Sequence, residues 1–236
     1  MGTNRELKKR GRAALAGSRS DMLAVSVITI LAGGVNLFCF IADQVIMIIC
    51  SMLIRSDYVP ALSGALRWVY LIVFIHFVIS VVAGSFIEMG YNRIILMKLK
   101  GKPVDKGILL YFRPVWLNTI FLRLYMGAKA ALWSFLFIIP GIAALLNYSM
   151  APYLIAQDPH LSPPVAVRLS KKLMKGYKLK LLKLIFSYII EMVMCFVAAG
   201  IPFIAVIPEI KMSVGAFYME RVRMHDNEII KNGKSN

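Results

Sequence analysis

Five side chains that can carry a charge or a proton lie in otherwise apolar stretches of this 236-residue sequence. At the centre of a bilayer a charged side chain costs about 2.5–3.5 kcal/mol on insertion scales, so each would need a partner or water. The chemistry that such residues support is ion pairing, proton transfer or the binding of a small polar solute. The five candidates for a polar site near the membrane midplane are Glu191, Lys211, Glu209, Lys129 and His76.

The spacing of these residues predicts their partners. Glu191 and Lys211 are equally distant in sequence from Ile201, so a turn there would place both side chains ~15 Å from the same surface. We therefore predict that Glu191 pairs with Lys211. Glu209 points elsewhere on the helix, and we expect Lys129 to be its partner, with His76 able to join them. The group either forms a cavity for a solute or a proton, or only fixes the register of packed helices, as buried pairs often do.

Catalytic motifs are not found in the sequence. It contains no G-x-S-x-G, no H-E-x-x-H, no glycine-rich phosphate loop and no Cys/His spacing that is typical of a metal site. The three cysteines all lie in apolar runs, where cysteine usually acts as a small hydrophobic side chain. We expect a non-enzymatic protein without a cofactor or metal.

The elements that would position these residues are membrane helices. The chain is 59% hydrophobic and only 17% charged, whereas roughly a quarter of a soluble domain is charged. Several apolar runs reach the ~20 residues that cross a ~30 Å hydrocarbon core. They lack the alternation expected of a membrane barrel. The predicted class is an all-α, multi-pass membrane protein.

The basic residues predict how the chain is oriented. The net charge is +16, and the Lys and Arg residues gather between the apolar runs rather than along one soluble surface. Such segments stay in the cytoplasm and contact anionic lipid headgroups, so we expect membrane lipid, and not nucleic acid, as the partner. Because residues 92–113 and 168–183 are both strongly basic, the apolar stretch between them crosses an even number of times, or not at all.

These constraints predict six transmembrane helices in three hairpins, with both termini cytoplasmic. Pro140-Gly141 and Gly200 with Pro202 are the expected outer turns, because proline interrupts a helix and glycine tolerates turn conformations. A re-entrant second limb after Pro140 is the alternative. Whether residues 45–63 re-enter the membrane is left open. The predicted spans are about 22–42, 68–89, 118–139, 141–157, 184–199 and 203–219, within a membrane domain 22–220.

Basic amphipathic helices should lie on the membrane surface. One is expected in the N-terminal segment 1–21, another in the plane of the membrane at 163–178, and a basic cytoplasmic tail at 221–236. A solvated linker is the alternative for 163–178. The candidate contacts with anionic lipid are Lys8, Lys9, Arg10, Arg12, Arg168, Lys171, Lys172, Lys175 and Lys178.

An ordered set of motifs resembles a known family. The segments "LWSFLFIIPGI", "YSMAPYLIAQDP", "SKKLMKGYK" and "GAFY" are similar to those of the bacterial integral membrane family called domain of unknown function 975. The resemblance implies a multi-pass protein of a bacterial plasma membrane and attaches no activity. The chain departs from the family at Glu191, where an aromatic is usual, and at Pro208-Glu209, where the family tends to have Pro-Tyr.

The sequence thus predicts an accessory or scaffold protein whose cationic cytoplasmic face binds anionic lipid or a partner protein in the membrane. The alternative is a small permease that uses the midplane charges, although no internal repeat of the kind found in many transporters is evident.

Overall fold

The computed structural model describes residues 2–17, 19–31, 60–103, 106–136, 138–189, 191 and 203–233. Within these residues the chain forms helices joined by turns and contains no strand, which confirms the all-α class. One predicted span, at about 22–42, is described only as far as Leu31. The second half of the 184–199 span and the predicted turn at Gly200 and Pro202 lie outside the described residues.

Helix α1 (Asn4–Leu15) is the expected amphipathic N-terminal helix. Thr3 and Glu6 form a capping box that satisfies free N–H groups at its start. Leu7, Gly11 and Leu15 are buried on one face. Helix α2 (Arg19–Leu31) follows as a separate element, so the helix expected in the N-terminal segment 1–21 ends before Arg19.

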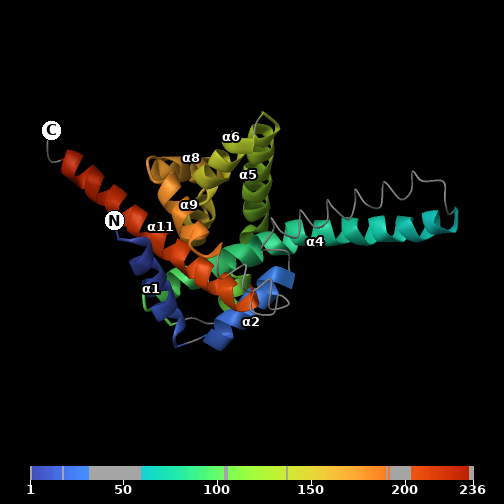
Figure 1. Cartoon of the computed structure of the whole chain (residues 1–236), viewed down its shortest axis with the longest axis horizontal. Helices are drawn as coiled ribbons and strands as arrows, with labels where there is room; N and C mark the ends of the chain where they lie inside the picture. Colours follow the sequence, from blue (N-terminus) through green and yellow to red (C-terminus); the bar gives the residue numbers. More distant parts are fainter. Residues whose placement is uncertain are drawn as a thin grey trace.

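Helix α11 (Phe203–Gly233) receives α1 along its side (Figure 1). The two helices run antiparallel, because the Gly2 N–H donates to Glu220 while Gly11 lies against Ser213. A Cβ at Gly11 would lie 2.8 Å from Ser213 Oγ, so glycine permits this close approach. The helix continues through most of the expected basic tail, to Gly233, and buried Arg221 donates from Nε to the Leu173 carbonyl at 2.9 Å.

Helix α4 (Pro60–Leu99) has 40 residues and contains the whole predicted 68–89 span. Its N-terminal half projects away from the other helices, whereas its C-terminal half passes through the centre of the bundle (Figure 1). Gly90 on this second half contacts the backbone of Leu109, in the short 3-10 helix η1 (Lys106–Leu110). A second short turn, η2 (Arg113–Val115), leads into the next long helix.

Helices α5 (Trp116–Leu136) and α6 (Ile138–Tyr148) contact each other, as expected of consecutive limbs. The predicted turn at Pro140-Gly141 is wrong, because both residues are helical and lie in the first turn of α6. Proline is tolerated there since the first N–H groups of a helix have no intrahelical acceptor.

Three shorter helices follow: α7 (Ala151–Gln157), α8 (Pro163–Met174) and α9 (Lys178–Phe186). The predicted 141–157 span is thus divided between α6 and α7. The predicted 163–178 helix ends at Met174, and Gly176 adopts a φ of 79° in the turn before α9. Glycine adopts this left-handed conformation readily, which explains why the helix stops here.

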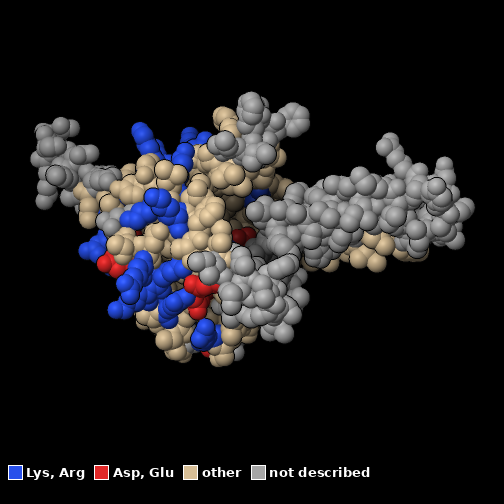
Figure 2. Space-filling model, viewed as in Figure 1, with Lys and Arg blue, Asp and Glu red and all other residues tan. Residues whose placement is uncertain are grey.

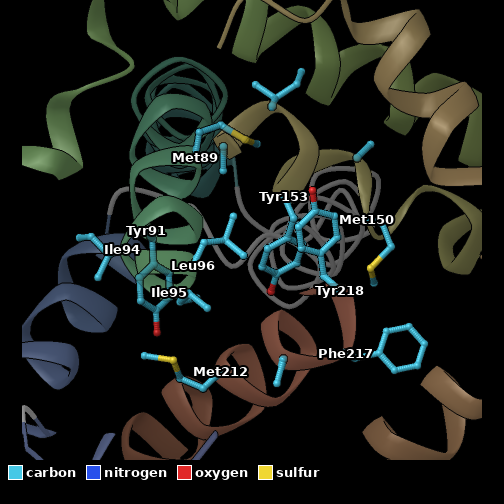
Figure 3. Close-up of a cluster of buried hydrophobic side chains, with 14 of the residues drawn as sticks. Met89, Tyr91, Ile94, Ile95, Leu96, Met150, Tyr153, Met212, Phe217 and Tyr218 are labelled. Atoms are coloured by element: carbon cyan, nitrogen blue, oxygen red, sulfur yellow. The ribbon is translucent and has the colours of Figure 1, made fainter. Parts of the chain in front are cut away.

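The core forms where α4, α7 and α11 meet (Figure 3). The rings of Tyr153 and Tyr218 stack with centroids 5.4 Å apart, and Tyr91 is fully buried toward α2. The Tyr91 hydroxyl lies 2.8 Å from Ser26 Oγ, which also donates to the Met22 carbonyl. Hydrogen-bonded aromatic side chains thus fix these helices against one another.

Tyr91 predicts a loss of stability at high pH. Burial raises the pKa of Tyr91 to about 12. Since the folded pKa exceeds the unfolded value near 10, this group stabilises fully below pH 10 and loses its contribution as pH rises through 12. We expect the wild type to lose about 2–3 kcal/mol more unfolding free energy than Tyr91→Phe between pH 10 and 12, as measured by denaturant titration. Equal losses in both proteins would contradict the assignment.

The hydropathy of the helices gives one further result. Among the residues that the structure describes, no helix combines the length and apolar character needed to cross a membrane.

Candidate functional site

Glu191 does not pair with Lys211, so that prediction is wrong. Glu191 instead accepts from Lys8 Nζ at 3.3 Å and from Arg12 Nη2 at 3.1 Å, both on α1. The prediction assumed a simple hairpin, and it did not consider that an N-terminal helix could lie alongside. Lys211 finds its acidic partner on α4 instead.

Glu209 likewise binds α1 and its neighbour rather than Lys129, which corrects the second predicted pair. Arg12 Nε donates to Glu209 at 2.9 Å, and Arg19 Nη2 donates at 3.3 Å. The hydrogen bond to Glu209 raises the pKa of Arg12. We call the five residues Lys8, Arg12, Arg19, Glu191 and Glu209 the N-terminal charge cluster.

The N-terminal charge cluster changes the role expected of the α1 cations. Lys8 Nζ also donates to the Ser187 carbonyl at 2.7 Å and lies 3.7 Å from the centroid of the Tyr188 ring. Lys8 and Arg12 are therefore engaged with the protein, although the Arg12 side chain is still 52% exposed. Their contacts with lipid stay a prediction. Lys9 and Arg10 are exposed, as a lipid contact requires.

A second group of charges lies inside the bundle, where α4, α5 and α11 meet. Lys211 Nζ donates to Glu88 Oε1 at 3.2 Å, and both side chains are about four-fifths buried, with 23% and 19% exposed. Arg123 on α5 is attracted to Glu88, and its Nη1 lies 3.4 Å from Ser85 Oγ. We call Ser85, Glu88, Arg123 and Lys211 the Glu88 cluster. In this cluster two cations, Lys211 and Arg123, interact with one carboxylate, Glu88.

The remaining predicted midplane residues do not join these clusters in the described contacts. Lys129 on α5 lies over the ring of Tyr125, with its Nζ 4.6 Å from the centroid. His76 is on the projecting half of α4, and its side chain lies outside the described residues. The five residues of the predicted site are thus distributed over at least three places.

Helix α8 carries the cations that the sequence predicted. Ala166, Val167 and Leu173 are buried on its inner face. Arg168, Lys171, Lys172 and Lys175 are exposed, and we call these four residues the α8 cationic face. Lys178, the fifth predicted residue, is half-buried at the start of α9. Lys and Arg gather on the part of the surface where α1, α8, α9 and α11 lie, with few acidic side chains among them (Figure 2).

Large apolar side chains are also exposed, on α4 and α5. On the projecting half of α4, Trp68, Ile72 and Phe74 are each more than 60% exposed. On α5, Leu117 and Leu132 reach 65% and 74%. Extended apolar surfaces of this kind mark sites that contact a membrane or another protein.

The carboxylates of the two clusters are arranged as ion pairs. In the described ranges, no three His, Cys, Asp or Glu side chains come together as metal ligands would. The carboxylates Glu88, Glu191 and Glu209 each face at least one cation. Paired in this way, these groups are suited to holding elements together or to binding charged groups.

Sequence reasoning missed Glu88 and Arg19 as partners. Glu88 stands at the end of the predicted 68–89 span, near the expected membrane interface, where a charge needs no partner inside the bundle. Gly11 was a usable signal for the N-terminal contacts. A glycine on the apolar face of a basic helix indicates close helix contact, and this contact brings Arg12 to Glu209.

Comparison with known proteins finds one family model that matches part of the chain. Residues 118–225 match the family model described as "Protein of unknown function (DUF975)". This confirms the resemblance for the part of the chain from α5 into α11. Neither the curated proteins nor the solved structures contain a match.

Proposed function

We propose that this chain, which carries a DUF975 segment over residues 118–225, is a non-enzymatic accessory or scaffold protein of a bacterial plasma membrane. Its cationic cytoplasmic surface would bind anionic lipid headgroups, and it could also receive a partner protein. The observation that carries the proposal is the α8 cationic face, on a helix whose opposite side is buried in the core.

The geometry of α8 suits a membrane surface. Its inner face is fixed by burial of Ala166 and Leu173, and Ser170 Oγ donates to the Asn147 carbonyl at 2.6 Å. The exposed cations are therefore presented on a rigid element. Each cation near an anionic surface contributes about 1 kcal/mol toward binding.

Exposed apolar side chains support the membrane part of the proposal. The projecting half of α4 and the outer side of α5 would leave large side chains such as Phe74 and Leu132 in water if nothing covered them. Acyl chains would cover both surfaces. The arrangement of six spans in three hairpins, with cytoplasmic termini, belongs to this proposal.

Neutralising two residues of the α8 cationic face is expected to weaken binding to anionic vesicles. In Lys171→Gln with Lys172→Gln, two contributions of about 1 kcal/mol are lost, so affinity should fall about 30-fold. Flotation of the purified full chain with phosphatidylglycerol-containing vesicles measures the effect. Lys171→Arg with Lys172→Arg keeps both charges and serves as the matched control.

The salt dependence of the same flotation assay distinguishes electrostatic binding to lipid headgroups from insertion of apolar side chains into the bilayer. Wild-type binding should weaken at high salt, because screening shortens the range of surface electrostatics. If the Gln and Arg variants float equally well at low salt, the α8 cationic face does not bind lipid and the proposal fails.

The Glu88 cluster favours a second candidate, a small permease for a proton or a charged solute. A partly buried carboxylate between two cations could bind a proton or a charged solute during transport. The substitution that separates the two functions is Glu88→Gln in reconstituted vesicles with a pH-sensitive dye inside. A folded variant that loses proton flux supports the permease. Unchanged flux, or no flux in the wild type, leaves the scaffold as the better candidate.

A further inference from the structure

A groove of about 260 Å³ lies where the C-terminal end of α4 and the end of α7 meet α11. Leu96 and Val222 supply apolar wall, and Lys100, Arg223, Asp226 and Gln157 supply polar groups. Pockets that enclose a whole small molecule usually measure about 300–1,000 Å³. This groove is smaller, so its size fits a headgroup whose hydrocarbon part lies outside.

The charges of the groove select an anion that also carries hydroxyl groups. Lys100 and Arg223 are exposed cations, and a phosphate can accept from both. Asp226 would oppose a bare phosphate, but its carboxylate can accept a hydrogen bond from an alcohol. A phosphate joined to a polyol satisfies the cations and the acid together.

The wall of the groove is fixed by hydrogen bonds. The Tyr218 hydroxyl donates to Gln157 Oε1 at 2.8 Å, and Tyr218 is 1% exposed. With its oxygen bound in this way, the Gln157 amide offers its N–H groups to a ligand. The helix carbonyls at the end of α4 are also occupied: Lys100 N–H donates to the Leu96 carbonyl at 3.2 Å and to that of Met97 at 3.1 Å. These carbonyls are therefore already satisfied when an anion arrives.

The groove and the α8 cationic face lie on different sides of α11. Arg221 turns toward α8, where it donates to the Leu173 carbonyl, while Val222 and Arg223 line the groove. A phospholipid surface that meets the α8 cationic face and also supplies a headgroup to the groove must therefore extend over both sides of α11. This step rests on the proposed function.

We propose that this groove binds the headgroup of an anionic phospholipid with free hydroxyl groups, phosphatidylglycerol being the probe. Lys100 and Arg223 hold the phosphate, Asp226 accepts from a glycerol hydroxyl, and the acyl chains leave over Leu96 and Val222. The α8 cationic face supplies attraction to any anionic surface, and the groove supplies preference for one headgroup.

The first experiment compares vesicles that carry equal charge. Wild-type protein should bind phosphatidylglycerol vesicles about tenfold more tightly than vesicles of phosphatidylethanol, which has the same charge but no free hydroxyl or ammonium to donate to Asp226. A hydrogen bond to a charged group is worth roughly one decade in affinity. Asp226→Ala should abolish this preference while total binding stays or rises, because an acid has been removed. Lys171→Gln with Lys172→Gln should weaken binding to both vesicles and keep the preference.

These outcomes separate the groove from the proposed function. If wild type binds both vesicles equally, or if Asp226→Ala keeps the preference, the groove proposal is overturned while lipid binding stands. If wild type binds neither kind of vesicle, the proposed function fails as well.

The second experiment locates the lipid and identifies its source. A phosphatidylglycerol with a photoreactive group near the headgroup should label peptides that contain Leu96–Lys100 or Met219–Arg223. Lys100→Gln with Arg223→Gln should lose that label. Labelling confined to α8 would overturn the proposal. Competition by soluble glycerol phosphate without lipid labelling would also overturn it, because the groove would then take a free phosphate ester.

Discussion

Replacing Glu88 by alanine is expected to lower the free energy of unfolding by about 3–5 kcal/mol. The substitution removes the partner of Lys211, whose side chain is only 23% exposed, and also removes the carboxylate that attracts Arg123. Lys211 would then lose the acidic partner that it has in the bundle. Denaturant titration of the purified variant measures the loss.

Glu191→Ala is the matched control for this prediction. Glu191 is also an ion-paired carboxylate, but its side chain is 33% exposed and its partner Arg12 is 52% exposed. Its other partner, Lys8, is 17% exposed but keeps its hydrogen bond to the Ser187 carbonyl and its contact with the Tyr188 ring, so we expect a cost of about 1 kcal/mol. Adding Lys211→Met to Glu88→Ala should recover part of the stability, because the cation that lost its acidic partner becomes apolar. If Glu88→Ala and Glu191→Ala lower the free energy of unfolding equally, burial does not strengthen the pair between Glu88 and Lys211.

Gly90→Ala is expected to destabilise the protein by about 3 kcal/mol, the upper part of the usual range for overpacking. A Cβ at this position would lie 2.7 Å from the Cα and 2.8 Å from the carbonyl carbon of Leu109, and closer still to its oxygen. These are backbone atoms, so no side-chain rotation relieves the contact. Thermal unfolding followed by circular dichroism measures the effect.

Gly127→Ala on α5 makes the same chemical change in an open place. No atom lies within 4 Å of the Cβ that would be added there. Alanine is the better helix former by about 1 kcal/mol, so this variant should be as stable as the wild type or more stable. If Gly90→Ala unfolds at the same temperature as Gly127→Ala, α4 and η1 do not approach as closely as described.

The two amphipathic helices could be predicted from sequence because their signal is local. In α1 and α8, apolar and basic residues repeat with the period of a helix, and this placed Leu7 and Leu173 inside and Lys171 outside. No knowledge of distant segments was needed. The end of α8 was missed by a few residues, because Gly176 stops the helix before the basic pattern ends.

The charge pairs could not be predicted, because their partners are distant in the chain. Arg12 and Glu209 belong to elements at opposite ends of the sequence, and a count of residues from a presumed turn gives no information about a third helix. The same limit applies to Glu88 and Lys211. A proline likewise indicates that a helix starts or stops nearby, without saying which: Pro140 lies at the beginning of α6 and not in the turn.

The antiparallel contact between α1 and α11 has a consequence for biosynthesis. A ribosome adds about 5–20 residues per second, so some 200 residues, or about 10–40 s, separate the synthesis of Gly11 from that of Ser213. Throughout this interval the apolar side of α1, including Leu7 and Leu15, has no native partner to cover it. The nascent chain must therefore shelter α1 by other means, on a lipid surface or with a chaperone, until α11 emerges.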